Sequence, residues 1–174
     1  MKKTIAFFGH REIYKQEIIK IKLMEILEEK VLQGYTNFLI GKHGDFDKIA
    51  LKCCLELKSN NNNINIIIVL TTLSLLKKDK FGFCDLDYYV NKGCQTMIYD
   101  IEEEYFKNRI IFSNKKMVDD SDLIICYVDL NKKSSGAKKA VEYAEKRGKE
   151  IINLHKEDKG FYPWFKKLIE KNLG

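Results

Sequence analysis

The sequence predicts a doubly wound α/β fold, with helices on both faces of a mainly parallel sheet. The strand-like segments are continuous apolar runs rather than alternating patterns, as expected for strands buried on both faces. Segments with helical periodicity separate these runs, which is the arrangement of parallel α/β sheets. The chain has 174 residues, of which 45% are hydrophobic and 32% charged. We therefore expect a single domain over residues 1–174.

Six runs rich in β-branched and aromatic residues are predicted strands. Each is short and bounded by polar or glycine-containing segments. They cover residues 4–8, 37–40, 64–70, 96–99, 123–128 and 150–154. Because such strands must be covered on both faces, the intervening segments are expected to supply helices to both sides of the sheet.

Helical periodicity covers residues 12–33, 45–58, 108–118 and 136–147. In the first of these helices, Ile18, Ile21, Ile26 and Val31 are expected to face the sheet; in the second, the apolar positions between Phe46 and Cys54 share one face. Residues 71–92 interrupt the pattern, and we expect an excursion containing a short helix. A last amphipathic helix is predicted near Pro163, packing through Trp164 and Leu168.

Charge and cysteine usage limit the partners. The 31 Lys and Arg against 25 Asp and Glu give a formal charge of +6, but the lysines are interleaved with acids. This balance suits an anionic ligand and favours nucleic acid only weakly. No apolar run reaches membrane-spanning length, so a cytoplasmic protein without a membrane partner is expected. Five cysteines without paired spacing favour buried thiols over disulfides or structural zinc.

Three loops that combine glycine or other small residues with hydrogen-bond donors directly follow predicted strands, and the third also opens a helix. They are "GHR" at Gly9, "GKHGDFD" at Gly41 and "DLNKKSSGA" at Asp129. Since the carboxyl ends of parallel strands share one edge, we expect Gly9, Gly44 and Gly136 to surround a single cleft. Backbone amides near glycines and at helix N-termini favour phosphate, with Arg11, Lys42, Lys132 and Lys133 as candidate counter-ions. One such loop alone would more simply be a turn and a helix cap.

Other chemistry is less clearly indicated. The chain lacks the complete G-x-G-x-x-G, P-loop and G-x-S-x-G motifs. His10 and His43 could bind a metal or transfer protons, but hydrogen bonding to backbone or ligand is the preferred interpretation. The aspartates of "CDLDYY" and "MVDDSD" are interpreted as caps and solvated turns. No cofactor and no metal are therefore expected, and the catalytic residues are left open.

The segments "IAFFGHR", "GKHGDFDKIA", "NKKMVDDSDLIICYVD" and "SSGAKKAVEYAEKRGKEIINL" resemble the SLOG superfamily. Within it they look most like the small stand-alone YpsA-like proteins of bacteria. The superfamily also contains the Lonely Guy phosphoribohydrolases and the DNA-processing protein DprA. The resemblance covers nearly the whole chain in the same order. It implies a Rossmann-like fold whose strand-end loops bind a nucleotide or nucleotide-sugar, such as an ADP-ribose derivative.

The resemblance also implies a set of site residues. The first glycine motif falls at residues 9–11, the second glycine loop at 41–47, a Ser-Asp pair at 121–122 and the phosphate loop at 135–137. With Lys42, His43 and Ser134 added by their position in the loops, the expected ligand-binding residues are Gly9, His10, Arg11, Gly41, Lys42, His43, Gly44, Asp45, Asp47, Ser121, Asp122, Ser134, Ser135 and Gly136.

Three functions are left open. The preferred one is a module that senses or sequesters a nucleotide, with the base against Phe46, His43 or a residue of the excursion. The second is a hydrolase or transferase at the N-glycosidic bond, for which Asp45, Asp47, Glu142 or one of residues 102–104 would supply the carboxylate. The Lonely Guy motif P-G-G-x-G-T-x-x-E is incomplete here, so its activity is not carried over. The third is a DNA-associated module. A homo-oligomer through the helix at Trp164 is a further expectation.

Overall fold

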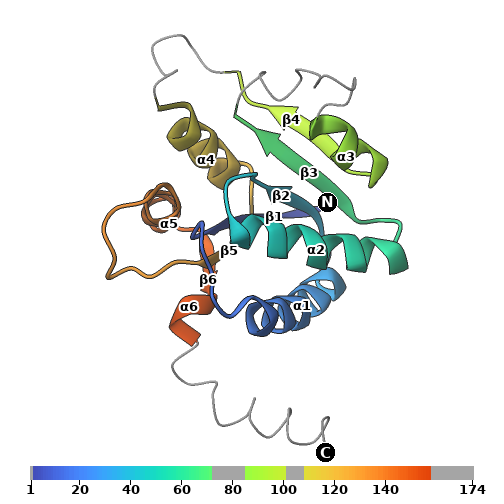
Figure 1. The fold of residues 1–174 in the computed structure, drawn as a ribbon, viewed down its shortest axis with the longest axis horizontal. Helices are drawn as coiled ribbons and strands as arrows, with labels where there is room; N and C mark the ends of the chain where they lie inside the picture. The colour runs from blue at the N-terminus through green and yellow to red at the C-terminus, as the bar shows by residue number, and fades with distance from the viewer. Residues whose placement is uncertain (1, 72–84, 101–107, 158–174) are drawn as a thin grey trace, which may run out of the picture.

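In the computed structural model, which describes residues 2–71, 85–100 and 108–157, six strands form one sheet (Figure 1). They are β1 (Lys3–Gly9), β2 (Tyr35–Ile40), β3 (Asn65–Leu70), β4 (Gln95–Ile98), β5 (Leu123–Tyr127) and β6 (Glu150–Asn153). Every pairing is parallel, and the strand order is β4-β3-β2-β1-β5-β6. The doubly wound, parallel α/β fold predicted from the sequence is confirmed.

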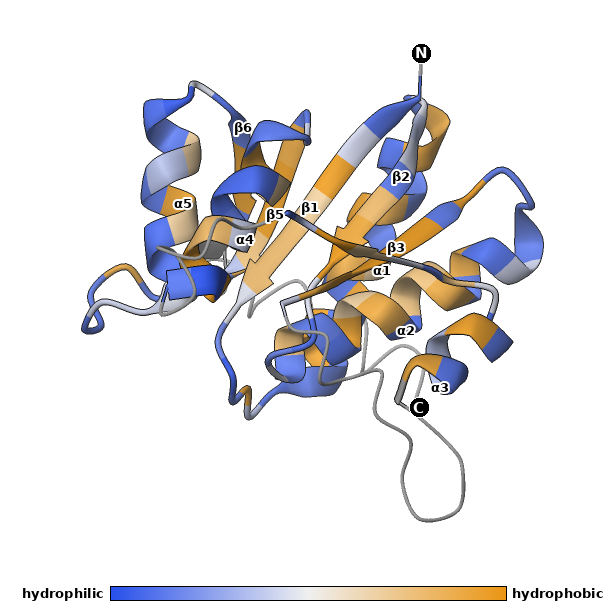
Figure 2. Cartoon of the chain, turned by 90° about the horizontal axis from the view of Figure 1, so that it is seen from above, coloured by the Kyte–Doolittle hydropathy of each residue, from blue (hydrophilic) through white to orange (hydrophobic). Residues whose placement is uncertain are grey.

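Helices cover both faces of the sheet (Figure 2). They are α1 (Gln16–Leu32), α2 (Asp45–Asn60), α3 (Asp85–Asn91), α4 (Arg109–Asp119), α5 (Gly136–Lys146) and α6 (Leu154–Glu157). Ile5 and Phe7 of β1 pack with α1 and α2, whereas Ala6 and Phe8 pack with α4 and α5. Because successive side chains of a strand point to opposite faces, this double burial explains the continuous apolar runs in the sequence.

The predicted apolar faces of α1 and α2 can be compared with the residues that are buried in the structure. In α2, Phe46, Ile49, Ala50, Cys53 and Cys54 are all buried, as predicted. In α1 the predicted face is partly wrong, because the fully buried residues are Ile19, Leu23 and Leu27 while Ile21 is 40% exposed. Apolar residues occur around most of this helix, so periodicity alone did not determine which side meets the sheet.

Helix α1 begins at Gln16, later than predicted from the sequence. The preceding residues continue the loop after β1, and an Asp45 carboxylate oxygen accepts hydrogen bonds from the Ile13 backbone N–H (3.1 Å) and the Gln16 side chain (3.1 Å). The first turn of α2 thus holds this loop in place. Helix α3 lies within the predicted excursion, but the rest of that segment and the helix predicted at Pro163 lie outside the described residues.

No helix in the described ranges combines the length and apolar character needed to cross a membrane.

The described cysteines, Cys53, Cys54, Cys94 and Cys126, are free and buried, as expected, while Cys84 lies outside the described residues. Burial raises the pKa of Cys53 to about 12 and also raises the pKa values of Cys54 and Cys94. Thiolates are the reactive form, so these side chains should be inert in the native state.

We predict that these four thiols react with Ellman's reagent only at the rate at which the protein unfolds. The measurement is the absorbance of released thionitrobenzoate in native buffer, compared with the same protein in guanidinium chloride. Reaction of more than one thiol per molecule within minutes in native buffer would contradict the buried positions.

Candidate functional site

The strand order reverses next to β1. From β1 the chain adds β2, β3 and β4 successively on one side, then crosses to place β5 and β6 on the other side (Figure 1). The crossovers after β1 and β5 therefore diverge, and a crevice opens outside their carboxyl ends. Such a switch point is where open α/β sheets bind ligands.

A cavity of about 300 Å³, here called the inner cavity, lies at this switch point. Its walls come from the end of β1, the loops after β1 and β2, the N-terminus of α5 and one side of α4. The lining residues are Phe7, Phe8, Gly9, His10, Arg11, Gly41, His43, Asp47, Ile110, Asn114, Met117, Ser135, Gly136 and Ala137. The predicted convergence of Gly9 and Gly136 on one cleft is thus confirmed.

Close packing requires glycine at positions 9 and 44. A Cβ atom on Gly9 would lie 2.3 Å from Cβ of Phe46, and one on Gly44 would lie 2.6 Å from Cα of Arg11. The Asp45 N–H also donates to the Arg11 carbonyl (3.0 Å). The N-terminus of α2 therefore lies directly against the loop after β1, and these two glycines are needed there whether or not a ligand binds.

His10 connects the two sides of the switch point. Its backbone N–H donates to the Tyr127 carbonyl (3.2 Å), and its ring Nε2 accepts a hydrogen bond from the Asp129 N–H (2.8 Å). Burial, together with nearby Lys132, lowers the pKa of His10. The ring is therefore neutral with its proton on Nδ1. His10, which lines the cavity, thus has one ring N–H that can donate a hydrogen bond.

Asp47 and His43 occupy the α2 side of the inner cavity. An Asp47 carboxylate oxygen accepts a hydrogen bond from the His43 backbone N–H (2.7 Å), and it lies close to Gly41. Burial raises the pKa of Asp47 to about 6. The His43 ring lies 3.4 Å from the Thr71 hydroxyl, and burial, followed by Arg11 and Lys42, lowers its pKa. Among the described residues, Asp47 is the one carboxylate that lines this cavity.

Helix α5 presents its N-terminus to the cavity. The Ser135 hydroxyl caps the helix by accepting a hydrogen bond from the Lys138 N–H (3.2 Å). The amides of Gly136 and Ala137 have no hydrogen-bond acceptor within the part of the chain that the structure describes. The Lys138 ammonium donates to the carbonyls of Leu130 (2.8 Å) and Lys132 (3.2 Å) and so fixes the preceding loop. The two unoccupied amides and the helix dipole favour an anion here.

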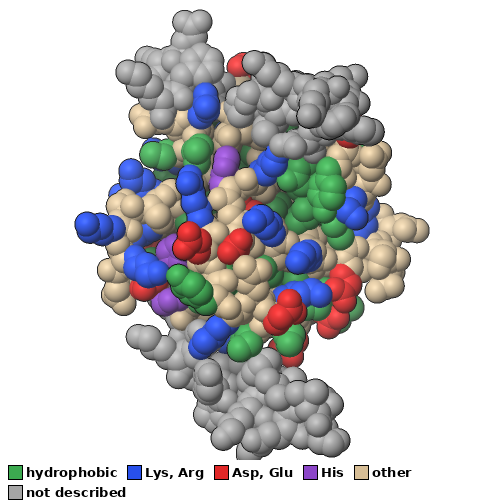
Figure 3. Space-filling model, viewed as in Figure 1, with side chains coloured by type: hydrophobic (Ala, Val, Ile, Leu, Met, Phe, Trp, Pro, Cys, Tyr) green, Lys and Arg blue, Asp and Glu red, His purple; other side chains and the backbone are tan. Residues whose placement is uncertain are grey.

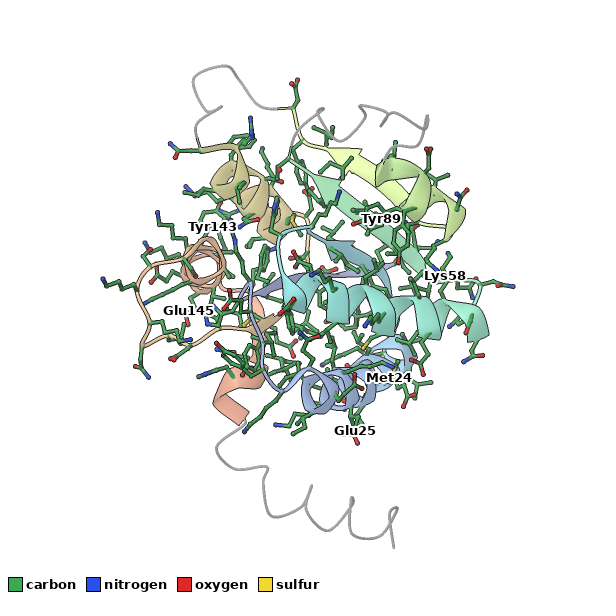
Figure 4. All side chains as sticks on the ribbon, in the orientation of Figure 1. Met24, Glu25, Lys58, Tyr89, Tyr143 and Glu145 are labelled. Atoms are coloured by element: carbon green, nitrogen blue, oxygen red, sulfur yellow. The ribbon has the colours of Figure 1, made fainter. Side chains whose placement is uncertain are left out.

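Helix α4 supplies residues that the sequence interpretation missed, namely Ile110, Asn114 and Met117. The Asn114 amide approaches the Gly136 carbonyl at 3.5 Å. Helix α4 is held beside α5 because the Tyr143 hydroxyl, on the α4 side of α5, donates to Asp119 (3.1 Å; Figure 4). The available sequence signal was a polar residue, Asn114, one turn before Met117 on the buried side of a predicted helix.

A second cavity of about 500 Å³, here called the outer cavity, adjoins the inner one. The two share Arg11, Ile110, Ser135 and Gly136. The other residues that line the outer cavity are Asn108, Arg109, Ile111, Ser134 and Lys139. Figure 3 shows one face of the molecule in space-filling form, and on this face histidine side chains lie among lysines and arginines. Together, the cavities contain nine of the fourteen residues expected from the sequence.

The remaining expected residues do not line either cavity. Gly44 and Asp45 lie next to the inner cavity, and the Lys42 ammonium lies 5.7 Å from the ring centroid of Tyr89. Ser121 and Asp122 are at the opposite edge of the sheet because they precede β5. There the Ser121 hydroxyl donates to the Val118 carbonyl, and Asp122 and Thr4 exchange two hydrogen bonds.

Other side chains considered from the sequence also lie away from the cavities. Phe46 is fully buried, so the expectation that it stacks on a base is wrong. Glu142 is exposed on α5 and lines neither cavity, and the glutamates at 102–104 lie outside the described residues. Within the described ranges, no group of three or more His, Cys, Asp or Glu is arranged to hold a metal ion.

No family model matches the chain, and no curated protein shows significant similarity to it.

Proposed function

We propose that this protein binds a nucleotide or nucleotide-sugar of the ADP-ribose kind and serves to sense or sequester it. The observation that carries the proposal is the convergence of the loops after β1 and β2 and the N-terminus of α5 on one cavity at the switch point. Its volume of about 300 Å³ lies at the lower end of ligand sites in general, and the adjoining outer cavity extends it.

The chemistry of the lining supports a phosphorylated ligand with hydroxyl groups. The amides of Gly136 and Ala137 and the guanidinium of Arg11 can bind a phosphate where the two cavities meet. The neutral His10 ring offers a donor, Asp47 offers acceptors for sugar hydroxyls, and the Asn114 amide can do both. Ile110 and Met117 add an apolar wall. No acid-base pair is needed for this function.

Thermal unfolding with a panel of adenosine, AMP, ADP and ADP-ribose tests the proposal. A ligand present at one hundred times its Kd should stabilise the native state by about 2.7 kcal/mol. For a chain of this length that stabilisation raises Tm by about 5 °C or more. Chromatography of the same mixtures should detect no free base. If none of the four compounds shifts Tm and none binds in calorimetry at millimolar concentration, the proposal is wrong.

A second candidate, cleavage of an N-glycosidic bond, is favoured by one observation. Asp47 is a carboxylate at the cavity whose pKa is raised to about 6, the range of acid-base residues near neutral pH. In this reaction water adds to C1′ of the sugar as the C1′–N bond breaks, and the base leaves with a proton. Ionised Asp47 would take the proton of the attacking water or stabilise the cationic sugar.

The two candidates differ in the behaviour of Asp47→Asn. Under the enzyme hypothesis the wild type releases base with a rate that rises with pH and levels off above about 6, since the carboxylate is the active form. Asp47→Asn then abolishes release, whereas Glu142→Gln, which alters an exposed carboxylate outside the cavity, leaves it intact. Under the binding hypothesis no release occurs in any of the three proteins.

Asp47 also gives a prediction about stability. Its pKa rises from 3.8 to about 6 on folding, so the folded state prefers the protonated carboxyl. The stability contributed by Asp47 is complete below pH 4 and is lost as pH rises to about 6. A full shift of this size corresponds to about 3 kcal/mol. Because the side chain keeps some exposure to the cavity, we expect Asp47→Asn to stabilise the protein by about 1–2 kcal/mol at pH 7.5.

Guanidinium chloride unfolding of wild type and Asp47→Asn from pH 4 to pH 8 measures this difference. The variants should converge at the acidic end and separate between pH 4 and 6. Asn retains an oxygen to accept the His43 N–H, so the comparison isolates the charge. A variant that is less stable than wild type at pH 7.5 would contradict the burial of an ionised carboxylate.

A further inference from the structure

The outer cavity combines positive side chains with a helix N-terminus. It is lined by Arg11, Arg109 and Lys139 and by the first residues of α5, and no carboxylate of a described residue lines it. Among the described residues, none of the three cations has an ion pair. Three positive groups held near one another without counter-ions repel each other, so an anion bound among them is stabilised by all three.

The inner cavity differs in charge, because a carboxylate lines it together with Arg11. It contains Asp47, and an ionised carboxylate there would repel a phosphate placed deep in the cavity. The two cavities meet at Arg11, Ser135 and Gly136. A phosphate at this boundary would lie with its sugar directed inward, toward His10 and Asp47. A second phosphate attached to the first would then extend outward, toward Arg109 and Lys139.

We infer that the outer cavity is the subsite for a distal phosphate, and that the ligand is therefore a diphosphate spanning both cavities. This inference rests on the proposed function and assigns roles to two residues outside the predicted set. Arg109 comes from the first turn of α4 and Lys139 from the first turn of α5. Their side chains select a nucleoside diphosphate or ADP-ribose over a nucleoside monophosphate, while Arg11 and the α5 amides hold the phosphate common to all of them.

Isothermal titration calorimetry of wild type with AMP, ADP and ADP-ribose at low ionic strength tests the inference. We expect ADP and ADP-ribose to bind up to about 25-fold more tightly than AMP, because each of the two exposed cations adds up to about fivefold. Arg109→Gln and Lys139→Gln should each lower ADP affinity about fivefold, and the double variant should bind ADP about as weakly as AMP. AMP affinity should stay nearly unchanged in all of them.

Lys146→Gln is the matched control, since it removes the same charge from the last turn of the same helix and lines neither cavity. It should keep the preference for ADP. Equal affinity of wild type for AMP and ADP, or a preference for ADP that survives the double variant, would overturn the inference but leave nucleotide binding intact. If wild type binds none of the three compounds, the proposed function itself fails. Unchanged Tm of the unliganded variants shows that they fold.

Discussion

Arg11→Gln is expected to reduce affinity for ADP-ribose about 100-fold, because charge-assisted hydrogen bonds to a phosphate contribute about 1.5–3 kcal/mol. Arg11 lines both cavities and is exposed, so its guanidinium can reach a phosphate where the cavities meet. Glutamine keeps much of the length of the side chain and removes its charge. The backbone carbonyl of residue 11, which accepts the Asp45 N–H, is unaffected.

Calorimetric titration with ADP-ribose measures this loss, and Lys52→Gln is the control. Lys52 is exposed on α2 and lines neither cavity, so its replacement lowers the net charge equally without touching the site. Both variants should unfold at the wild-type Tm without ligand, since no packing contact is lost. Wild-type affinity in Arg11→Gln would remove Arg11 from the site.

Gly9→Ala is expected to destabilise the native state by about 3 kcal/mol, the upper part of the usual range for overpacking. The added Cβ would lie 2.3 Å from Cβ and 2.4 Å from Cγ of Phe46, which is fully buried. Neither atom belongs to the flexible end of a side chain, so α2 as a whole must move. The strain comes from lack of space alone, because the φ angle of Gly9 is not positive.

Gly136→Ala is the matched comparison for stability. A Cβ atom there would lie 3.7 Å from the Asn114 amide nitrogen, an ordinary van der Waals contact, and alanine is favourable within a helix. Chemical denaturation midpoints should therefore separate the two variants clearly. Shortening Phe46 to alanine should not rescue Gly9→Ala, because alanine keeps the Cβ atom that lies nearest. Equal stability of Gly9→Ala and wild type would refute the close contact of β1 with α2.

The fold could be predicted from the sequence because its determinants are local. The segment "INIIIVL" is apolar without alternation, and its residues in β3 are covered on both faces. Such runs leave few architectures other than a parallel sheet between helices. The buried face of α1 could not be predicted in the same way, since its apolar residues do not form one stripe.

Site residues at or directly after the end of a strand could be predicted from the sequence. Site residues on other elements could not. Gly9 ends β1, and His10 and Gly41 directly follow β1 and β2, so the direction of the strands alone places them at the carboxyl edge. Asn114 reaches the cavity only because β5 pairs with β1. This pairing places α4 and α5 over the two strands. Strand order is a nonlocal property, and no short motif in the sequence encodes it.

The pairing of β1 with β5 has a consequence for how the molecule is made. Thr4 and Asp122, which exchange hydrogen bonds beside this pair, are 118 residues apart in the sequence. Closing so large a loop is entropically unfavourable, and long-range parallel pairing forms slowly. A chain emerging from the ribosome can build β1 to β4 early, but Gly9 and Gly136 become neighbours only after α5 has been synthesised. The pocket therefore forms only after β5 and α5 have joined β1, and a truncated product ending before β5 would lack it.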